Sequence, residues 1–400
     1  MLSVDEAQKI ILAEVRQLGT ESVPLALSLG RFLAEDIVAG CDDPPWDRSA
    51  MDGYAVVSGD TIGASAHTPC KLTVIENIPA GTMPQKKITP GTASKIMTGA
   101  PIPEGADAVV KIEESEQHNE IVSIYCAAER GDYIRTRGEV VACGAVVLQK
   151  GVFIRACEIA LMASIGISLV PVFRRPRVAI LSTGDELVDI HQPKGPHQIY
   201  NSNGYGLSAQ VVEAGGIPIV LGIAKDTRDD LMAKLKSISG VDFILISGGV
   251  SVGDYDFVRE VIKELSGTIA FWKVAMKPGK PLAFGMISGV PVFGLPGNPV
   301  SSMVTFDQFV RPVLFYAQGS FITLRAAIYA TLTERIHKEP GRCYFVRGHL
   351  TIEDGAYRVA PTGDQDSSNL VSLVKANAFI VLAEACGDVE VGERVSVQIL

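Results

Sequence analysis

The sequence lacks an excess of positive charge, a long apolar run and any clustered set of cysteines or histidines. Its 36 lysine and arginine residues are outnumbered by 45 aspartate and glutamate residues, which gives a formal net charge of −9. Because a global basic field is missing, non-specific binding to nucleic acid or to an anionic membrane is not expected. A small anionic substrate stays compatible with this charge, since screening makes the local charges decisive.

The missing runs and spacings exclude further classes of protein. No apolar run reaches the ~20 residues that a membrane-spanning helix needs. The seven cysteines form no C-x-x-C pair and have no zinc-ligand spacing, which is typical of reduced thiols in a cytosolic protein. The first residues carry acid and no basic region, so no signal peptide is expected and the predicted location is cytoplasmic. The six histidines show no useful spacing, which gives little support to Ser-His-Asp or Cys-His chemistry.

The apolar residues that are present divide the chain into segments of different texture. With 47% hydrophobic residues in a chain of 400, roughly two to four domains are expected. Apolar positions at helical spacing predict helices over 4–18 and 156–165. Short extended runs, punctuated by Gly, Pro and Asp, predict a small β domain between residues 55 and 150.

Residues 176–316 show the alternation typical of an α/β domain. Strands that are apolar throughout and separated by helices indicate a parallel sheet covered on both faces. The predicted strands are 177–182, 217–223, 242–247 and 291–295, and the predicted helices lie near 203–214, 228–238, 254–265 and 299–310. After Phe321, alternating strands return and predict a small β barrel or sandwich. These strands are 325–333, 343–350, 356–360, 378–383 and 394–400.

The most informative loop is Ser247–Asp256, which follows a predicted strand and opens a helix. Its glycines allow backbone N–H groups to approach a phosphate, and the helix start adds unpaired donors. Asp254 and Asp256 could hold a divalent cation beside that anion. A strand-to-helix turn in which Asp254 caps the helix explains the same residues. Taken alone, the loop is weak evidence of function.

Three other loops are expected at the same edge of the sheet, because ligands of a parallel α/β sheet bind at the carboxyl ends of its strands. They are 183–186, 225–226 and 296–301, and the lysine-rich segment 273–281 lies beside them. Helix caps, a β-turn and a rigid helix entry explain each loop separately. Together they predict a site for an anion and a divalent metal.

The motifs in these loops resemble those of the MoeA family, the molybdopterin molybdenumtransferases. The α/β motifs are TGDE at 183–186, SGGVSVG at 247–253, KPGKP at 277–281 and GLPGNP at 294–299, and the upstream lid motifs are SAMDGYA at 49–55 and MTGAP at 97–101. The resemblance covers essentially the whole chain in the family's order. The equivalent α/β domain also occurs in gephyrin.

The resemblance implies a multi-domain α/β plus β fold and an elongated, L-shaped homodimer. Its centre is a doubly wound, mostly parallel α/β sheet, flanked by a β-rich lid domain and a C-terminal small β barrel. The implied domains are 1–45 plus 142–172 (helical, linking), 46–141 (lid), 173–322 (molybdopterin-binding) and 323–400 (barrel). The implied reaction inserts molybdate into the dithiolene of adenylylated molybdopterin, releasing AMP and molybdenum cofactor, with Mg²⁺ assisting.

The resemblance also implies roles for individual residues. The implied catalytic residues are Asp52, Thr98, Glu186, Asp226, Asp256, Lys277 and Lys280. The implied binding residues are Thr183, Gly184, Asp185, Ser247, Gly248, Gly249, Ser251, Gly253, Lys273, Pro296, Gly297, Asn298, Arg347 and Ser367. The implied magnesium ligands are Glu186, Asp226 and Asp256. Of these residues, Arg347 and Ser367 match positions expected to face molybdate, whereas without the resemblance they read as an exposed barrel Arg and a turn Ser.

One position departs from the family's Arg-x-x-Gly-Glu-Asp pattern, because Val140 replaces its final acid. Valine can neither coordinate a metal nor accept a proton. Either that acid is dispensable, or Glu139 serves instead, or the activity is altered. We expect that Glu139 does not compensate, since adjacent residues of a strand face opposite sides.

Other interpretations stay open at this point. The related molybdopterin adenylyltransferase resembles the α/β segment alone, so the flanking segments 1–172 and 323–400 speak against that activity. A scaffold or carrier that only binds the pterin is a second alternative. A tungstate-specific enzyme is a third, because tungstate and molybdate have nearly the same size and charge. The adenylyltransferase and cofactor-accepting enzymes are further partners that the resemblance suggests. The sequence does not decide which subunit of a dimer supplies which site residue.

Overall fold

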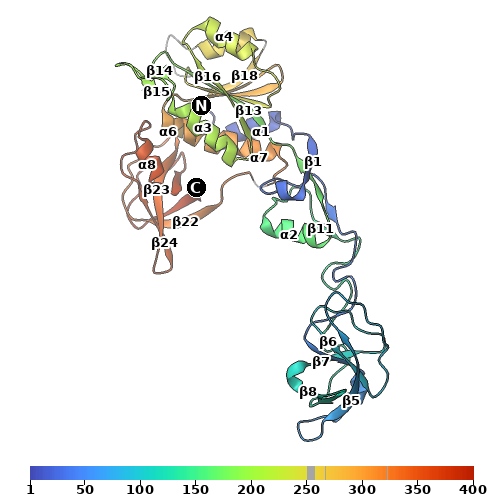
Figure 1. Cartoon of the computed structure of the whole chain (residues 1–400). Coiled ribbons are helices and arrows are strands. Elements are labelled where there is room, and N and C mark those ends of the chain that lie inside the picture. Colours follow the sequence, from blue (N-terminus) through green and yellow to red (C-terminus); the bar gives the residue numbers. More distant parts are fainter. Residues whose placement is uncertain (250–256, 266, 322) are drawn as a thin grey trace.

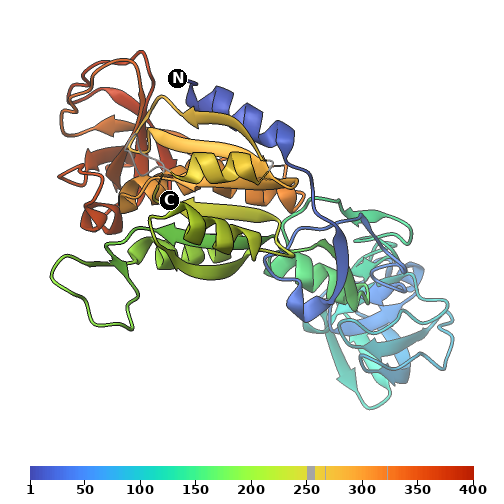
Figure 2. The ribbon, with the colours of Figure 1, turned by 90° about the horizontal axis from the view of Figure 1, so that it is seen from above.

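The computed structural model describes residues 1–249, 257–265, 267–321 and 323–400. The molecule is elongated, with an α/β domain and a C-terminal barrel side by side at one end and the lid domain (46–141) at the other, as Figure 1 and Figure 2 show. A narrow connecting domain lies between the two ends. Among the described residues, no helix has the length and apolarity needed to cross a membrane.

A mixed sheet forms the centre of the α/β domain. In spatial order its strands are β16 (Ile217–Ala224), β13 (Arg177–Thr183), β17 (Phe243–Ser247), β21 (Val290–Leu295), β20 (Pro281–Ile287) and β18 (Thr268–Lys273). The first four run parallel, and they are the strands that the apolar runs predict. β20 and β18 were not predicted, and they continue the sheet in antiparallel pairing.

Helices cover both faces of this sheet, as its apolar strands predict. The described helices of the domain are α1 (Val4–Glu14), α3 (Ser202–Glu213), α4 (Arg228–Lys236), α5 (Phe257–Glu264), α6 (Pro299–Thr305) and α7 (Arg311–Ala317), with a π-helical turn, η4 (Phe306–Val310), joining the last two. α4 and α5 contribute to the core on one face, and α1, α3, α6, η4 and α7 to the core on the other. The predicted helix 299–310 therefore continues to Ala317, because Arg311-Pro312 stands where Pro is tolerated at the start of a helical turn.

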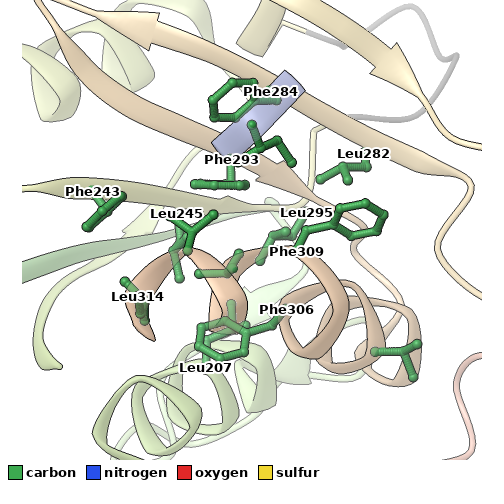
Figure 3. Packing of buried hydrophobic residues seen from close by; sticks show 14 of the residues in the cluster. Leu207, Phe243, Leu245, Leu282, Phe284, Phe293, Leu295, Phe306, Phe309 and Leu314 are labelled. Atoms are coloured by element: carbon green, nitrogen blue, oxygen red, sulfur yellow. The ribbon is translucent and has the colours of Figure 1, made fainter. Parts of the chain in front are cut away.

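The larger core lies between the sheet and the helical run α6–η4–α7, as Figure 3 shows. Phe284 and Phe293 of neighbouring strands pack with their ring centroids 5.1 Å apart. Phe306, Phe309 and Leu314 come from the helical side and are almost completely buried. Burial of such side chains is worth about 1.5–3 kcal/mol each.

Helix α1 also packs into this core, although the expected boundaries group residues 1–45 with the connecting domain. Ser3 caps the helix through a capping box with Glu6, and the backbone turns extended at Val15, so the helix ends at Glu14 rather than at residue 18. Val4, Ala7 and Ile11 follow one another at helical spacing and are buried against the sheet.

The C-terminal domain is a closed barrel, which decides between the predicted barrel and sandwich. Its strands, in pairing order, are β23 (Cys343–Glu353), β24 (Ala356–Pro361), β22 (Ala327–Leu332), β26 (Arg394–Ile399) and β25 (Ala378–Leu382), and β25 pairs with β23 to close it. The short helix α8 (Leu370–Val374) precedes β25. The α/β segment β19 (Met276–Lys277) pairs in parallel with β23, so hydrogen bonds join the two domains.

Short strands and one helix build the connecting domain. They are β1 (Thr20–Pro24), η1 (Leu25–Leu27), β2 (Ile37–Val38), β11 (Val146–Leu148), α2 (Ala156–Ser164) and β12 (Leu169–Phe173). The β-rich lid has a sheet in the order β7 (Ala108–Lys111), β4 (Gly53–Val56), β6 (Thr92–Ile96), β5 (Cys70–Ile78), β9 (Ile121–Ile124) and β8 (Ser115–His118). Smaller lid elements are β3 (Arg48–Ser49), η2 (Ser58–Thr61), η3 (Ile112–Glu114) and β10 (Ile134–Arg135).

Candidate functional site

A cleft of about 1180 Å³ lies between the α/β domain and the barrel. Loops that follow β13, β17 and β21 line it from the α/β side, as expected for the carboxyl edge of a parallel sheet. The barrel contributes Arg342 and the loop 364–368. The predicted site residues that line it are Thr183, Gly184, Glu186, Asp226, Ser247, Gly248, Gly249, Lys277, Lys280, Pro296, Gly297, Asn298 and Ser367.

Glycines at the cleft adopt backbone conformations that side chains would block. Gly248 has φ +96°, and a Cβ atom there would lie 2.6 Å from the carbonyl oxygen of Thr183. Gly279 has φ +101°, and its Cβ would lie 2.4 Å from Oγ1 of Thr305. The described part of the chain offers no hydrogen-bond partner to the buried Oγ1 of Thr183. The Thr183 hydroxyl is therefore buried beneath the glycine loop without a partner among the described residues, which is uncommon for a buried polar atom.

Acidic residues meet at the same edge of the sheet. Glu186 and Asp226 line the cleft. The Asp185 N–H donates to Asp226 Oδ2 at 3.3 Å, and the Asp226 N–H donates to Asp185 Oδ1 at 3.2 Å, so the two loops support each other. No group of three or more His, Cys, Asp or Glu side chains suited to a metal occurs among the described residues.

The predicted acidic and glycine-rich site extends beyond the described residues. Ser251, Gly253, Asp254 and Asp256 lie outside the described residues. Carboxylate and hydroxyl oxygens are the donors that Mg²⁺ prefers. Glu186, Asp226 and the Thr183 hydroxyl are therefore oxygen donors of the type that a magnesium ion binds.

The predicted lysines do not all reach the cleft. Lys277 and Lys280 line it, on either side of Pro278-Gly279. Lys273 does not, because it lies at the end of β18, half-buried and opposite Pro281 in the sheet. Of the three lysines expected at the site, only Lys277 and Lys280 therefore line the cleft.

The barrel loop that carries Ser367 is fastened to the α/β domain. Asn298 Nδ2 donates to Ser367 Oγ at 2.7 Å, and the Val300 N–H donates to the Ser367 carbonyl at 3.1 Å. These bonds place Ser367 at the cleft.

Arg347 differs from its expected position, because it is 1% exposed and does not line the cleft. Its Nε donates to Ser372 Oγ at 3.1 Å, and its Nη2 donates to the Asp366 carbonyl at 2.9 Å. Burial lowers the pKa of Arg347, against the opposite effect of Asp364 and Asp366. The side chain thus organises the loop that carries Ser367 instead of facing the cleft.

Asp52 and Thr98 form a separate constellation in the lid domain. The N–H and the Oγ1–H of Thr98 both donate to Asp52 Oδ1, each at 2.7 Å. These two bonds hold the pKa of Asp52 below its ordinary value, the backbone donor having the larger effect. The lid lies at the far end of the chain from the α/β domain, as Figure 1 shows. Within one chain, the structure therefore does not bring this pair to the cleft.

Asn203 and Arg342 are among the cleft residues that the sequence reasoning missed. Asn203 donates through Nδ2 to Ser247 Oγ and to the Gly297 carbonyl, both at 2.8 Å, and so ties two cleft loops together. The polar run 201–204, at the start of a predicted helix, is the signal that could have drawn attention to it. Arg342 was also missed, because it directly precedes a strand and belongs to none of the motifs considered.

Comparisons with known proteins follow the same division of the chain. Family models match residues 2–166 (MoeA N-terminal region, domain I and II), 179–316 (probable molybdopterin binding domain) and 329–400 (MoeA C-terminal region, domain IV). The molybdopterin molybdenumtransferase of Bacillus subtilis is 39% identical, over 100% of this chain and 94% of the relative.

The chain belongs to the MoeA family.

Other members support the same assignment. The molybdopterin molybdenumtransferase of a Nostoc strain is 39% identical over 96% of this chain and 90% of its own length. The crystal structure of the molybdopterin biosynthesis MoeA protein of Pyrococcus horikoshii matches with a TM-score of 0.86 and 32% identity, covering 100% of both chains. The predicted family and fold class are confirmed.

The turn that departs from the MoeA family pattern is visible in the lid. Val140 is 66% exposed. Glu139 accepts hydrogen bonds from Arg135 Nη1 at 2.6 Å and from the Thr136 N–H at 3.0 Å, which lower its pKa. Both residues lie in a turn rather than in the strand that our sequence argument assumed. The strand argument therefore does not apply, and whether Glu139 compensates stays a prediction; its carboxylate is bound to Arg135 and Thr136.

Gly248→Ala tests whether the close packing of the glycine loop is required. We expect it to lower the free energy of unfolding by about 1–3 kcal/mol more than Gly240→Ala does, because the new Cβ overlaps the Thr183 carbonyl. Gly240 is the matched control, since it also has a positive φ but no atom within 4 Å of its Cβ position. Denaturant unfolding measures both, and equal losses would contradict the prediction.

Thr98→Val tests the cause of the lowered Asp52 pKa. Valine removes the hydroxyl donor and keeps the backbone donor, so the pKa should rise part of the way towards its ordinary value. A depressed carboxylate pKa stabilises the fold above the unfolded-state pKa, and this contribution is lost as pH falls through the folded-state pKa. The variant should therefore lose less stability on acidification. NMR titration of the Asp52 carboxyl measures the shift, and Thr98→Ser, which keeps the donor, should titrate like the parent protein.

Proposed function

We propose that this protein inserts molybdate into the dithiolene of adenylylated molybdopterin, with release of AMP and formation of molybdenum cofactor. The observation that carries the proposal is that loops with the family's glycine motifs, Lys277 and Lys280, and the carboxylates of Glu186 and Asp226 all line one cleft. This cleft is large enough for a ligand of nucleotide-pterin size, since ligand pockets are commonly about 300–1,000 Å³.

The residue types of the cleft suit the two anionic parts of this substrate pair. Molybdate is a tetrahedral dianion, and Lys277 and Lys280 can bind it and support the loss of one oxygen ligand. The dithiolene sulfurs belong to the substrate, so no protein thiolate is required. In agreement, burial raises the pKa of Cys343, which lies close behind the cleft, to about 11 and keeps it a thiol at neutral pH.

A magnesium ion is part of the proposal and fits the oxygen donors described above. Glu186 and Asp226 would hold it, together with Asp256, which lies outside the described residues. When bound, the ion would neutralise phosphate charge while the phosphoanhydride is cleaved and AMP leaves. The two loops that carry Asp185 and Asp226 brace each other, which keeps the Asp226 backbone in place for this role.

We further propose that the active unit is a homodimer. In one chain the lid constellation lies at the opposite end of the molecule from the cleft. A partner subunit could bring its lid, with Asp52 and Thr98, over the cleft of the first. This arrangement would give the lid residues of the family access to the substrate.

Molybdenum insertion by the purified full-length protein tests the function. Adenylylated molybdopterin, Mg²⁺ and molybdate are supplied, and AMP release and cofactor formation are followed. Robust turnover is expected, and it would also show that Val140 is tolerated. Tight pterin binding without turnover would reject the proposal in favour of a carrier or scaffold, and turnover with tungstate alone would make the protein a tungstate inserter.

Mixing two inactive variants tests the shared site. Asp52→Ala and Lys277→Ala should each lose most activity, because one removes a lid residue and the other a cleft residue. After subunit exchange, a mixed dimer holds one intact site if lid and cleft come from different chains. Activity should then return to about a quarter of the parent value, because half of the dimers are mixed and each keeps one of two sites. Exchange is verified by native mass spectrometry, and mixtures that stay inactive after proven exchange would show that each site is built within one chain.

A further inference from the structure

The lid is joined to the rest of the molecule by two passages of chain, residues 37–43 and 141–148, which we call the lid connection (Figure 1). The passages run antiparallel, and Val38 pairs with Val146 and Asp43 with Val141. Counted three positions inward from the first pair, or two from the second, Cys41 falls opposite Cys143. The two pairs therefore place the same two cysteines across from each other.

A hydrogen bond holds Cys143 against the passage that carries Cys41. Cys143 lies in a turn, which the Ala145 N–H closes by donating to the Ala142 carbonyl at 3.0 Å. The Cys143 N–H donates to Oδ1 of Asp42, the neighbour of Cys41, at 2.8 Å. In a regular antiparallel pair, opposite Cα atoms lie about 4.5–5.5 Å apart, within the span of about 4.4–6.8 Å that a disulfide needs. The turn departs locally from that ladder, so we expect bond formation to draw it towards the facing passage.

The thiols of Cys41 and Cys143 are both accessible. Each residue is exposed, and the described part of the chain offers neither thiol a hydrogen-bond partner. Exposed thiols that lie next to a second cysteine are the ones that reversible oxidation selects. The lid connection therefore carries the two features of a redox-sensitive pair.

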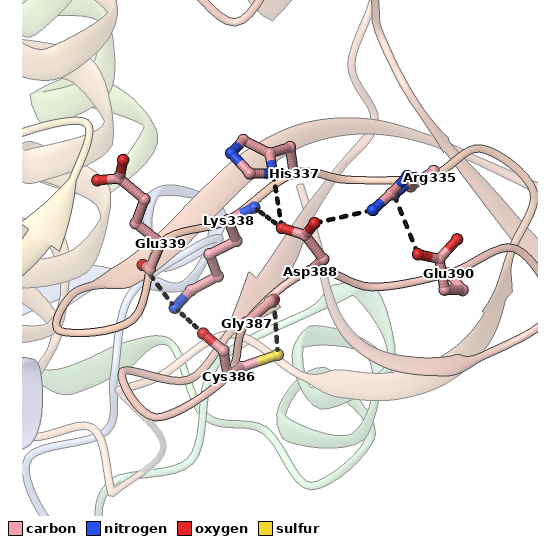
Figure 4. A network of polar contacts seen from close by, with 8 residues as sticks. All are labelled: Arg335, His337, Lys338, Glu339, Cys386, Gly387, Asp388 and Glu390. Carbon is pink, nitrogen blue, oxygen red and sulfur yellow. Dashed lines mark hydrogen bonds and ion pairs between the residues drawn. The ribbon is translucent and has the colours of Figure 1, made fainter.

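The other five cysteines are engaged or partly buried. Four of their thiols donate hydrogen bonds to oxygen atoms, namely those of Cys70, Cys126, Cys157 and Cys386. Figure 4 shows the last of these contacts, in which Cys386 Sγ donates to the Gly387 carbonyl at 3.4 Å. Burial raises the pKa of Cys343, the fifth, to about 11. A small oxidant therefore meets the cysteines of the lid connection first.

The carboxylate beside this pair is neutralised by a cation. Asp42 would disfavour a thiolate at its neighbours, because like charges repel each other. Arg137 forms an ion pair with Asp42 through its Nε. The negative charge next to the thiols is therefore offset, which favours thiol–disulfide exchange, since the attacking group in that reaction is a thiolate.

We propose that Cys41 and Cys143 form a reversible disulfide across the lid connection and that this bond restricts the position of the lid. The co-reactant is a low-molecular-weight disulfide. One cysteine thiolate attacks it, which forms a mixed disulfide and releases one small thiolate. The second cysteine thiolate then attacks the protein sulfur of the mixed disulfide, which forms the Cys41–Cys143 bond and releases the other small thiolate. The two released thiolates take up the two protons that the protein thiols lose, so two protein thiols are oxidised and one small disulfide is reduced.

Incubation of the reduced full-length protein with oxidised glutathione tests bond formation. The remaining thiols are then alkylated, and unreduced peptides are identified by mass spectrometry. We expect a Cys41–Cys143 linked peptide from a single chain, a loss of two of the seven thiols, and reversal by dithiothreitol. A link between two chains, glutathione left on both cysteines, or free thiols at both positions would each overturn the proposal.

Serine variants identify the two partners of the bond. Cys41→Ser and Cys143→Ser should each accumulate a mixed disulfide with glutathione at the remaining cysteine, because the second thiol is missing. Cys157→Ser is the matched control, since it removes the third exposed cysteine, whose thiol is bonded to Glu158. This control should form the Cys41–Cys143 bond like the parent protein, and its failure to do so would overturn the assignment of the pair.

Hydrogen exchange tests whether the bond restricts the lid. The Asp43 N–H donates to the Val141 carbonyl and the Gly144 N–H to the Ala39 carbonyl, both at 2.8 Å across the lid connection. These amides exchange when the two passages separate, so oxidation should slow their exchange at least about tenfold. Amides of the lid sheet are the internal control and should exchange equally in both states. Unchanged exchange of Asp43 and Gly144 in the oxidised protein would overturn the restriction.

Insertion activity adds a readout that rests on the proposed function. Because a lid over a site must move to release product, turnover of the oxidised parent should fall at least about threefold and recover on reduction. The double variant Cys41→Ser, Cys143→Ser should keep its turnover under the same treatment. Undiminished turnover of the linked protein would overturn the restriction of the lid. If the parent has no turnover at all, the proposed function fails, while a reversible link with slowed exchange upholds the inference.

Discussion

The parallel pairing of β19 with β23 is the interaction on which the cleft depends. It joins the α/β domain to the barrel at Met276 and Lys277, directly opposite Cys343 and Tyr344. Because side chains alternate along a strand, Met276 enters the α/β core while its neighbour Lys277 is left for the cleft. The Asn298–Ser367 hydrogen bond fastens the same two domains on the other side of the site. With both links in place, loops from two separate cores become the walls of one binding site.

Basic and acidic side chains line this site together. Lys277 on β19 and Arg342 before β23 meet at the junction of the two domains, and Glu186 and Asp226 follow strands of the α/β sheet. Asp364 and Asp366 of the barrel loop line the site as well. None of the ion pairs seen among the described residues joins one group to the other. If they did pair, each charge would be neutralised within the protein and neither an anion nor a divalent cation would gain from the cleft. The cleft thus presents both basic and acidic side chains to a ligand.

The sequence was sufficient to predict the parallel strands, the glycine loops and the family. Apolar runs indicate burial directly, and glycines indicate unusual backbone conformations. It did not reveal β20 and β18, since β18 pairs antiparallel with β20, and β20 with β21 through the turn at Ser288-Gly289, with no helix between these strands to mark them. Arg347 was misplaced for a similar reason. Nothing in its own strand shows that the strand is covered on both sides, so a buried arginine that supports a loop could not be told from one that faces a ligand. Asp52 and Thr98 lie in the lid, far from the cleft of the same chain, and no local sequence pattern reports that separation.

The slender connection of the lid to the rest of the molecule has a mechanical consequence. Two passages of chain form it, bridged by the pairing of Asp43 with Val141 and by hydrogen bonds between Ala39 and residues 144–145. Because the lid lies at the far end of the molecule, this connection is the point about which the lid would rotate (Figure 1). A small rotation there would displace Asp52 and Thr98 by a much larger distance. The hydrogen bonds of this connection therefore determine how stiffly the lid is held as it approaches another surface.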